Sequence, residues 1–202
     1  HRDLHSFPTR RSSDLSDLRN DLLIFMLSYA TDRAYRGVGD MPPLGIRMMA
    51  SLELALSAGE LKLTSTDPDE QPFLDYRYFQ QEEDLRRLRE AVRLCVSLGE
   101  HERFNDIIES RIEPTDEELA SDEDLDTYMI REVTTGQHIS GTCKMGPDSD
   151  DMAVVNQFGR VRGVQNLRIV DASIMPDCIR ANTNVTTMMI AERVSDFIKD
   201  GK

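Results

Sequence analysis

The pattern of apolar and polar residues predicts short strands followed by longer helices. A dense apolar run from Leu22 to Leu27, bounded by charged and amide residues, is too short to span a bilayer and predicts a buried strand. Further along, leucines alternate with polar or small residues on both sides of a turn at residues 57–59, which predicts an antiparallel hairpin with one buried face. The alternating leucines are Leu52, Leu54, Leu56, Leu61 and Leu63.

A helical period follows from Glu82 to about Leu98, and this helix is expected to cover the sheet. Its apolar stripe consists of Leu85, Leu88, Val92, Cys95 and Val96. The polar residues expected to point away are Glu83, Arg86, Arg87, Glu90 and Arg93. Because Cys95 lies on the apolar stripe, the pattern favours a packed core thiol over a reactive one.

Residues 113–126 contain eight acidic residues and no basic ones. Thr115 precedes Glu118 by three residues, and Ser121 precedes Asp124 by the same step, which is typical of capping boxes at helix starts. Acidic residues also stabilise the positive end of a helix. Solvated helix starts therefore explain the run better than a partner-binding acidic patch, which stays open as the alternative.

The last part of the chain predicts a strand and a helix that meet at one place. Residues 154–161 suggest a short strand and turn, and residues 167–170 predict a buried strand that ends at Asp171. A final amphipathic helix is expected from about Val185 to Ile198, with Asn184 as its cap. Strand ends and helix starts that converge are a usual ligand site in α/β folds.

Composition narrows the class of protein. The chain has 202 residues, is 39% hydrophobic and can bury a core, while its net charge of −13 argues against a nucleic-acid partner. No apolar run approaches the roughly 18–20 residues of a membrane span. Cys95, Cys143 and Cys178 are odd in number and lack metal-ligand spacing, which favours free thiols in the reducing cytoplasm.

The first fifteen residues differ from the remainder. They have no initiating Met and no helical or strand period, and they resemble translated sequencing-adapter sequence. We therefore expect residues 1–15 to be foreign to the domain and disordered, and we exclude His1 and His5 from any site.

Three separated blocks carry the strongest functional signal. They are Gly136–Gly146 with its H-x-x-G-T core, Leu167–Pro176, and Asn182–Asn184. In this order and at these distances they resemble the C-terminal signature of the glucose–methanol–choline (GMC) oxidoreductases. Residues 59–65 and 72–76 are similar to a strand pair and turn in the substrate domain of that family.

The resemblance covers nearly everything after about residue 16 and implies an α/β fragment. Residues 16–133 would form part of a substrate-binding domain, an antiparallel sheet covered by helices. Residues 134–202 would form the C-terminal part of a Rossmann-like FAD domain, with its last strand and helix. The G-x-G-x-x-G phosphate motif occurs nowhere in the sequence, so the chain is expected to be a truncated piece of such an enzyme.

The resemblance also implies FAD as cofactor and a small-molecule alcohol as substrate, with an electron acceptor that the sequence does not identify. In the family, side chains at the positions of His138 and Asn182 meet over the flavin. Oxidation of an alcohol requires a base that removes the hydroxyl proton as the hydride leaves the carbon. Histidine has an unperturbed pKa near neutrality, so His138 is the candidate base. The Asn182 amide would orient the substrate oxygen, and the two polar ends are expected within about 4–7 Å of each other.

By the same resemblance, the backbone around Asp171 and Ala172 would lie near the ribityl and phosphate part of FAD. The helix start at Asn184, Val185 and Thr186 would lie near the pyrimidine edge of the flavin, where the positive end of the helix dipole suits a reduced anionic ring.

Two other functions remain as alternatives. A hydrolase using Ser140 and His138 would need a strained nucleophile elbow, which the sequence around Ser140 lacks. A polypeptide without its own dinucleotide motif could also be an inert piece that does not bind cofactor. His101, between two glutamates after a helix, is expected to be a surface residue.

Overall fold

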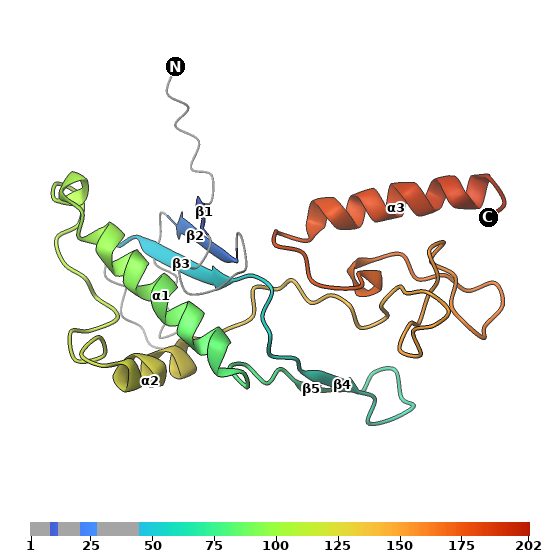
Figure 1. The fold of residues 1–202 in the computed structure, drawn as a ribbon, viewed down its shortest axis with the longest axis horizontal. Coiled ribbons are helices and arrows are strands. Elements are labelled where there is room, and N and C mark those ends of the chain that lie inside the picture. Colours follow the sequence, from blue (N-terminus) through green and yellow to red (C-terminus); the bar gives the residue numbers. More distant parts are fainter. Residues whose placement is uncertain (1–8, 12–20, 28–44) are drawn as a thin grey trace, which may run out of the picture. The chain divides into compact units, whose positions relative to one another are not determined.

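The computed structural model describes residues 9–11, 21–27 and 45–202 (Figure 1). The predicted mixed fold class is confirmed, because these residues combine two small antiparallel sheets with three α-helices. They form two compact units: one comprises the described residues up to Glu60 together with residues 74–133, and the other comprises residues 61–73 and 134–202. The functional assignment of the domains, substrate-binding and FAD-binding, stays a prediction.

The central strand of the first unit is the predicted apolar run. Strand β2 (Leu22–Leu27) lies between β1 (Thr9–Arg11) and β3 (Arg47–Leu52) in an antiparallel sheet. Leu22, Leu23 and Ile24 are at most 7% exposed, so consecutive side chains are buried on both faces of the strand. The prediction of a buried strand is confirmed.

The expectation that residues 1–15 are foreign and disordered stays a prediction, and of these residues the structure describes Thr9–Arg11. These residues pair with β2, with Thr9 opposite Ile24 and Arg11 opposite Leu22. Strand pairing satisfies the backbone N–H and C=O groups along the edge of β2 and requires no apolar period in the added strand. His1 and His5 lie outside the described residues.

The hairpin predicted from alternating leucines is also wrong. β3 pairs with β2, placing Leu52 opposite Leu22. The chain then leaves the sheet at Leu54, whose φ of 51° lies in the left-handed region. Leu63 is 81% exposed, so alternation here does not mark a buried face.

The strand pair suggested by the family resemblance is confirmed. β4 (Glu60–Lys62) pairs with β5 (Phe73–Asp75) in a two-stranded sheet. Gly59 leads into this hairpin, where a Cβ atom would lie 2.1 Å from the Asp75 carbonyl oxygen. Only glycine permits that approach.

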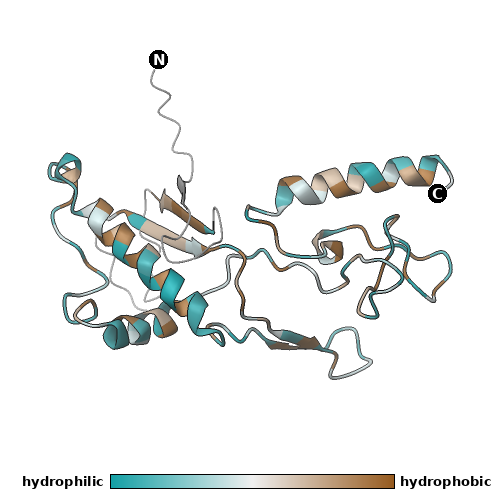
Figure 2. Cartoon of the chain, in the orientation of Figure 1, coloured by the Kyte–Doolittle hydropathy of each residue, from teal (hydrophilic) through white to brown (hydrophobic). Residues whose placement is uncertain are grey.

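Helix α1 (Glu82–Gly99) confirms the predicted helix and covers the sheet by contacting β2 and β3. Figure 2 shows β2 as hydrophobic, whereas α1 carries residues of both kinds. The prediction that Arg87 points away from the core is wrong, because its side chain is fully buried. Ala91, one helical turn further, is fully buried too.

Arg87 is buried because acidic and carbonyl oxygens surround its guanidinium group. Nε donates to Asp21 at 2.8 Å, Nη1 to Asp84 at 3.2 Å, and Nη2 to the Glu53 carbonyl at 2.8 Å. Asp84 in turn accepts from the backbone N–H groups of residues 56 and 57 at 2.9 and 2.7 Å. These bonds satisfy the irregular backbone after β3 in place of strand pairing.

Helix α2 (Asp122–Glu132) begins where the acidic run predicted a helix start. Ser121 accepts from the Asp124 N–H at 3.1 Å. Thr115 and Glu118 make reciprocal bonds, with the Thr115 N–H donating to the Glu118 carboxylate at 2.7 Å. Both predicted capping pairs are confirmed.

Cys95 on α1 is expected to resist alkylation, because burial raises the pKa of its thiol to about 11. Only the thiolate reacts rapidly with iodoacetamide. Mass spectrometry of the native chain should therefore show slow labelling of Cys95 at pH 8, with the rate rising toward pH 11. Rapid labelling at pH 8 in folded protein would contradict a packed thiol, and urea-unfolded chain provides the reference rate.

The second unit is built mainly from turns and isolated bridges around helix α3 (Asn184–Lys199). Its buried apolar residues are Ala153, Val155, Ile174, Met175 and Val194. The expected strand at residues 167–170 is wrong: Arg168 makes one isolated bridge with Arg160, and Leu167 is 47% exposed. Residues 154–161 likewise form a turn closed by a bridge between Val155 and Val161. Among the described residues, no helix has the length and apolar character needed to cross a membrane.

Candidate functional site

The first two signature blocks lie side by side in the second unit. The backbone N–H groups of Gly141, Cys143 and Met145 donate to the carbonyl oxygens of residues 172, 173 and 174 at 3.3, 2.9 and 2.8 Å. Residues 172–174 form the short 3₁₀ helix η3 (Ala172–Ile174). Blocks that are thirty residues apart in sequence are therefore hydrogen-bonded along their length.

Asp171 and Ala172, predicted to lie near the cofactor, are at this junction. The Asp171 carboxylate accepts from the Ser173 N–H at 2.8 Å and so begins η3. The Ala172 carbonyl accepts from Gly141, whose φ of 80° lies in the left-handed region that favours glycine. The structure places both residues beside the H-x-x-G-T block, and their contact with a cofactor stays a prediction.

The first and third blocks meet through a hydrogen bond between His138 and Thr183. Thr183 Oγ1 lies 3.2 Å from His138 Nδ1, across 45 residues of sequence. Thr183 is 8% exposed, and His138 is half-buried. Asn182 is exposed and precedes Thr183, so its Cα lies about 3.8 Å from that of Thr183. That His138 and Asn182 reach one substrate oxygen stays a prediction.

The start of α3 differs from the prediction. Its N-cap is Thr183, and Asn184 is the first helical residue. Thr183 has helical backbone angles (φ −76°, ψ −19°) and makes no side-chain cap bond, since its hydroxyl faces His138 instead. The sequence predicted a helix start here, but it did not predict that the side chain of the N-cap residue would contact His138.

This arrangement fits an anionic group at the helix start. The first turn contains no acidic residue. Within the described part of the chain, no acceptor pairs with the backbone N–H groups of Asn184, Val185 and Thr186. Unpaired N–H groups at a helix N-terminus carry partial positive charge and bind anions. The predicted cofactor residues at this helix start therefore have the donors that such a role requires.

An exposed apolar face adjoins the same helix start. Val185, Met188 and Met189 are 71%, 53% and 56% exposed, and their spacing of three and four residues places them on one face of α3. Contact between this apolar face and a cofactor stays a prediction.

The geometry disfavours the hydrolase alternative. His138 Nδ1 pairs with Thr183, and among the described residues no hydrogen bond joins His138 to Ser140. Sequence reasoning missed Thr183 as a site residue. Its position between two asparagines before a helix was the available signal, but that position predicts a cap rather than a partner for histidine.

His101 confirms its prediction as a surface residue. It is exposed, and its Nδ1 accepts from the Arg103 backbone N–H at 3.2 Å. The His101 side chain is therefore hydrogen-bonded within its own turn, in the first unit.

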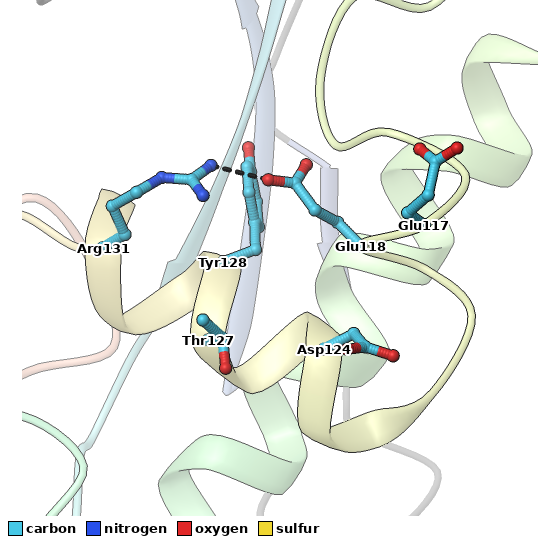
Figure 3. A pocket seen from close by; sticks show the side chains of 6 residues that line it. All are labelled: Glu117, Glu118, Asp124, Thr127, Tyr128 and Arg131. Carbon is cyan, nitrogen blue, oxygen red and sulfur yellow. Dashed lines mark hydrogen bonds and ion pairs between the residues drawn. The ribbon is translucent and has the colours of Figure 1, made fainter.

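A separate hollow in the first unit lies over α2 (Figure 3). Its lining residues are Glu117, Glu118, Asp124, Thr127, Tyr128 and Arg131. Glu118 is already paired: the Thr115 N–H and then the Arg131 guanidinium lower its pKa. Burial raises the pKa of Tyr128 to about 12, so this phenol stays protonated. The paired charges match a helix-start network and not a catalytic centre.

A sequence profile described as GMC oxidoreductase matches residues 55–191. The chain belongs to the GMC oxidoreductase family. The oxygen-dependent choline dehydrogenase of Proteus mirabilis (strain HI4320) is 39% identical over 143 residues, which are 71% of this chain and 25% of that protein.

Two solved GMC-like structures extend the comparison to the fold. The formate oxidase of Aspergillus oryzae, in a structure described for its FAD modification, matches with a TM-score of 0.79 at 25% identity, over 91% of this chain and 32% of that one. A fungal aryl-alcohol oxidase matches with a TM-score of 0.69 at 27% identity, over 89% of this chain and 28% of that one. The chain thus spans about a quarter of the curated relative and about a third or less of the solved structures.

Proposed function

We propose that this chain supplies the catalytic part of an FAD-dependent enzyme that oxidises a small alcohol to a carbonyl compound. The hydrogen bond between His138 and Thr183 supports this most directly, because it joins the H-x-x-G-T block to the block that contains Asn182. Membership of the GMC oxidoreductase family gives the reaction class. The names of the relatives, choline dehydrogenase and aryl-alcohol oxidase, indicate the kind of alcohol.

FAD, when bound, would accept a hydride from the carbon that carries the hydroxyl group. The residues of this chain would handle the proton. Nδ1 of His138 is already paired with Thr183, so Nε2 is the ring nitrogen that can take the hydroxyl proton. The Asn182 amide would hydrogen-bond the substrate oxygen and orient it toward the imidazole.

The cofactor would be held at the helix start and at the junction of the first two blocks. Asn184, Val185 and Thr186 would offer backbone N–H groups to an anionic edge, and the apolar face of α3 would contact a ring. Asp171 and Ala172 would lie beside the more polar part of the molecule.

The test is reduction of bound flavin by alcohols, in an enzyme of the relatives' full length that carries this sequence as its C-terminal part. Anaerobic mixing with choline, an aryl alcohol or a short primary alcohol is expected to bleach the flavin absorbance with at least one of them. Bound FAD that no alcohol in the panel reduces would overturn the proposal.

The second candidate is an inert piece without cofactor binding of its own, which the lack of a G-x-G-x-x-G motif favours. Titrating the purified 202-residue chain with FAD separates the two. Quenching of flavin fluorescence that saturates would show binding by this chain alone, and no quenching would place cofactor binding in the longer polypeptide only.

Asn182→Ala is expected to slow flavin reduction in the full-length enzyme less than loss of His138 does, while FAD stays bound. The amide orients the substrate oxygen and carries no proton, so its loss removes one hydrogen bond from the transition state. Stopped-flow reduction rates and the flavin content of the purified variant measure the two effects separately. Normal turnover in the remaining holoenzyme together with lost flavin would make Asn182 a cofactor-site residue instead.

A further inference from the structure

The Thr183 side chain does not cap the helix that it precedes. Its side chain would ordinarily accept from a backbone N–H in the first helical turn. Here it makes no such bond, and its Oγ1 lies 3.2 Å from His138 Nδ1. The residue is 8% exposed, so water has little access to compete for this contact.

The backbone of Thr183 is held firmly. Its carbonyl oxygen accepts two bonds from Thr187, one from the backbone N–H and one from the side-chain hydroxyl, each at 2.9 Å. The backbone of Thr183 is therefore fixed with respect to α3, and the contact between Oγ1 and Nδ1 links the imidazole to this helix.

We propose that Thr183 is a positioning residue that holds neutral His138 as the tautomer with its proton on Nδ1. This inference rests on the proposed function. The Thr183 contact occupies Nδ1, which leaves Nε2 to face a substrate. A base must offer an unprotonated nitrogen, so in the neutral ring the proton belongs on Nδ1, and Thr183 Oγ1 accepts from it.

The same contact serves the ring in both protonation states. When Nε2 takes a proton, both ring nitrogens become donors, and Oγ1 still accepts from Nδ1 without any rotation. If Thr183 donated to Nδ1 instead, the neutral ring would carry its proton on Nε2 and would present a donor to the substrate hydroxyl. Whether Nε2 accepts from the substrate hydroxyl or donates to it thus depends on the direction of the hydrogen bond at Nδ1.

The tautomer can be measured on the 202-residue chain without cofactor or substrate. Long-range ¹H–¹⁵N spectra of the imidazoles would be recorded at about pH 8.5, above the ordinary histidine pKa of about 6.5. His101 is an internal reference, because its Nδ1 accepts from a backbone N–H and its neutral ring must carry the proton on Nε2. His101→Gln and His138→Gln would assign the signals.

We expect a protonated-type shift at Nδ1 for His138 and the opposite pattern for His101. Thr183→Val, which has a similar shape but no hydroxyl, should move His138 toward the Nε2–H tautomer, and Thr183→Ser should restore the Nδ1–H pattern. The His101 signals should not change in either variant, because His101 lies in an exposed turn of the first unit. Unchanged amide shifts along α3 would report that the second unit is folded in each variant.

Two results would overturn the proposal: the Nε2–H tautomer for His138 in the unaltered chain, or an unchanged tautomer in a folded Thr183→Val variant. The first needs no variant and so does not depend on how well one folds. Absence of alcohol oxidation in the full-length enzyme, with the expected tautomer in the chain, would refute the proposed function while leaving the role of Thr183 in place.

Discussion

Replacing His138 with alanine is expected to slow flavin reduction roughly 10²–10⁴-fold in a full-length enzyme that carries this sequence, the range typical of losing a positioned acid–base group. The imidazole would take the hydroxyl proton as hydride leaves, and alanine offers no acceptor. The reduction rate is measured by anaerobic stopped-flow mixing with a saturating alcohol, so that weaker substrate binding does not enter the result.

His101→Ala is the matched control, because it also removes an imidazole but from an exposed turn of the first unit. Its reduction rate should equal that of the parent. A His138→Ala rate within tenfold of the parent would remove His138 from the role of base. Flavin content must be equal in the compared proteins, since lost cofactor would lower the signal without any effect on proton transfer.

Replacing Arg87 with methionine is expected to lower the free energy of unfolding of the first unit by about 3–5 kcal/mol. Methionine keeps most of the stem but removes the charge that Asp21 and Asp84 share, and both carboxylates are buried. The carbonyl oxygens of Glu53 and Leu54 would lose their donor as well. Two buried carboxylates left without the cation between them account for the size of the effect.

Urea unfolding followed by far-ultraviolet circular dichroism measures this loss. Arg93→Met is the control on the same helix, because Arg93 is 47% exposed and pairs with Asp122, which is 57% exposed. Exposed ion pairs contribute little, so this variant should unfold with the parent. If both variants unfold at the same urea concentration as the parent, the buried cluster does not hold the first unit together.

The candidate site depends on contacts between blocks that the sequence separates. Backbone bonds join the H-x-x-G-T block to η3, and the His138–Thr183 bond joins it to the start of α3. Each block alone is a loop with little regular structure. Their convergence gives the half-buried imidazole a partner at Nδ1, and the proposed function assigns the proton transfer to Nε2.

The sequence by itself determined the elements whose signals are local. A continuous apolar run predicted β2, a period of three and four residues predicted α1, and the Thr115–Glu118 and Ser121–Asp124 steps predicted their capping bonds. In each case the signal lies within a short stretch of neighbouring residues. The three signature blocks also determined the family, because their order and spacing are properties of the sequence.

Tertiary structure alone decided the outcomes that depend on distant partners. The alternating leucines after residue 52 predicted a strand. In the structure the backbone N–H groups of residues 56 and 57 donate to Asp84 instead of to a neighbouring strand. The helical pattern predicted that Arg87 faces solvent, because the sequence does not show that Asp21, 66 positions away, binds its guanidinium group. A threonine before a helix is expected to cap that helix, and only the tertiary structure shows that the Thr183 hydroxyl contacts His138 instead. Polar groups bond to the oxygen or nitrogen that is nearest in space, and the sequence order does not state which one that is.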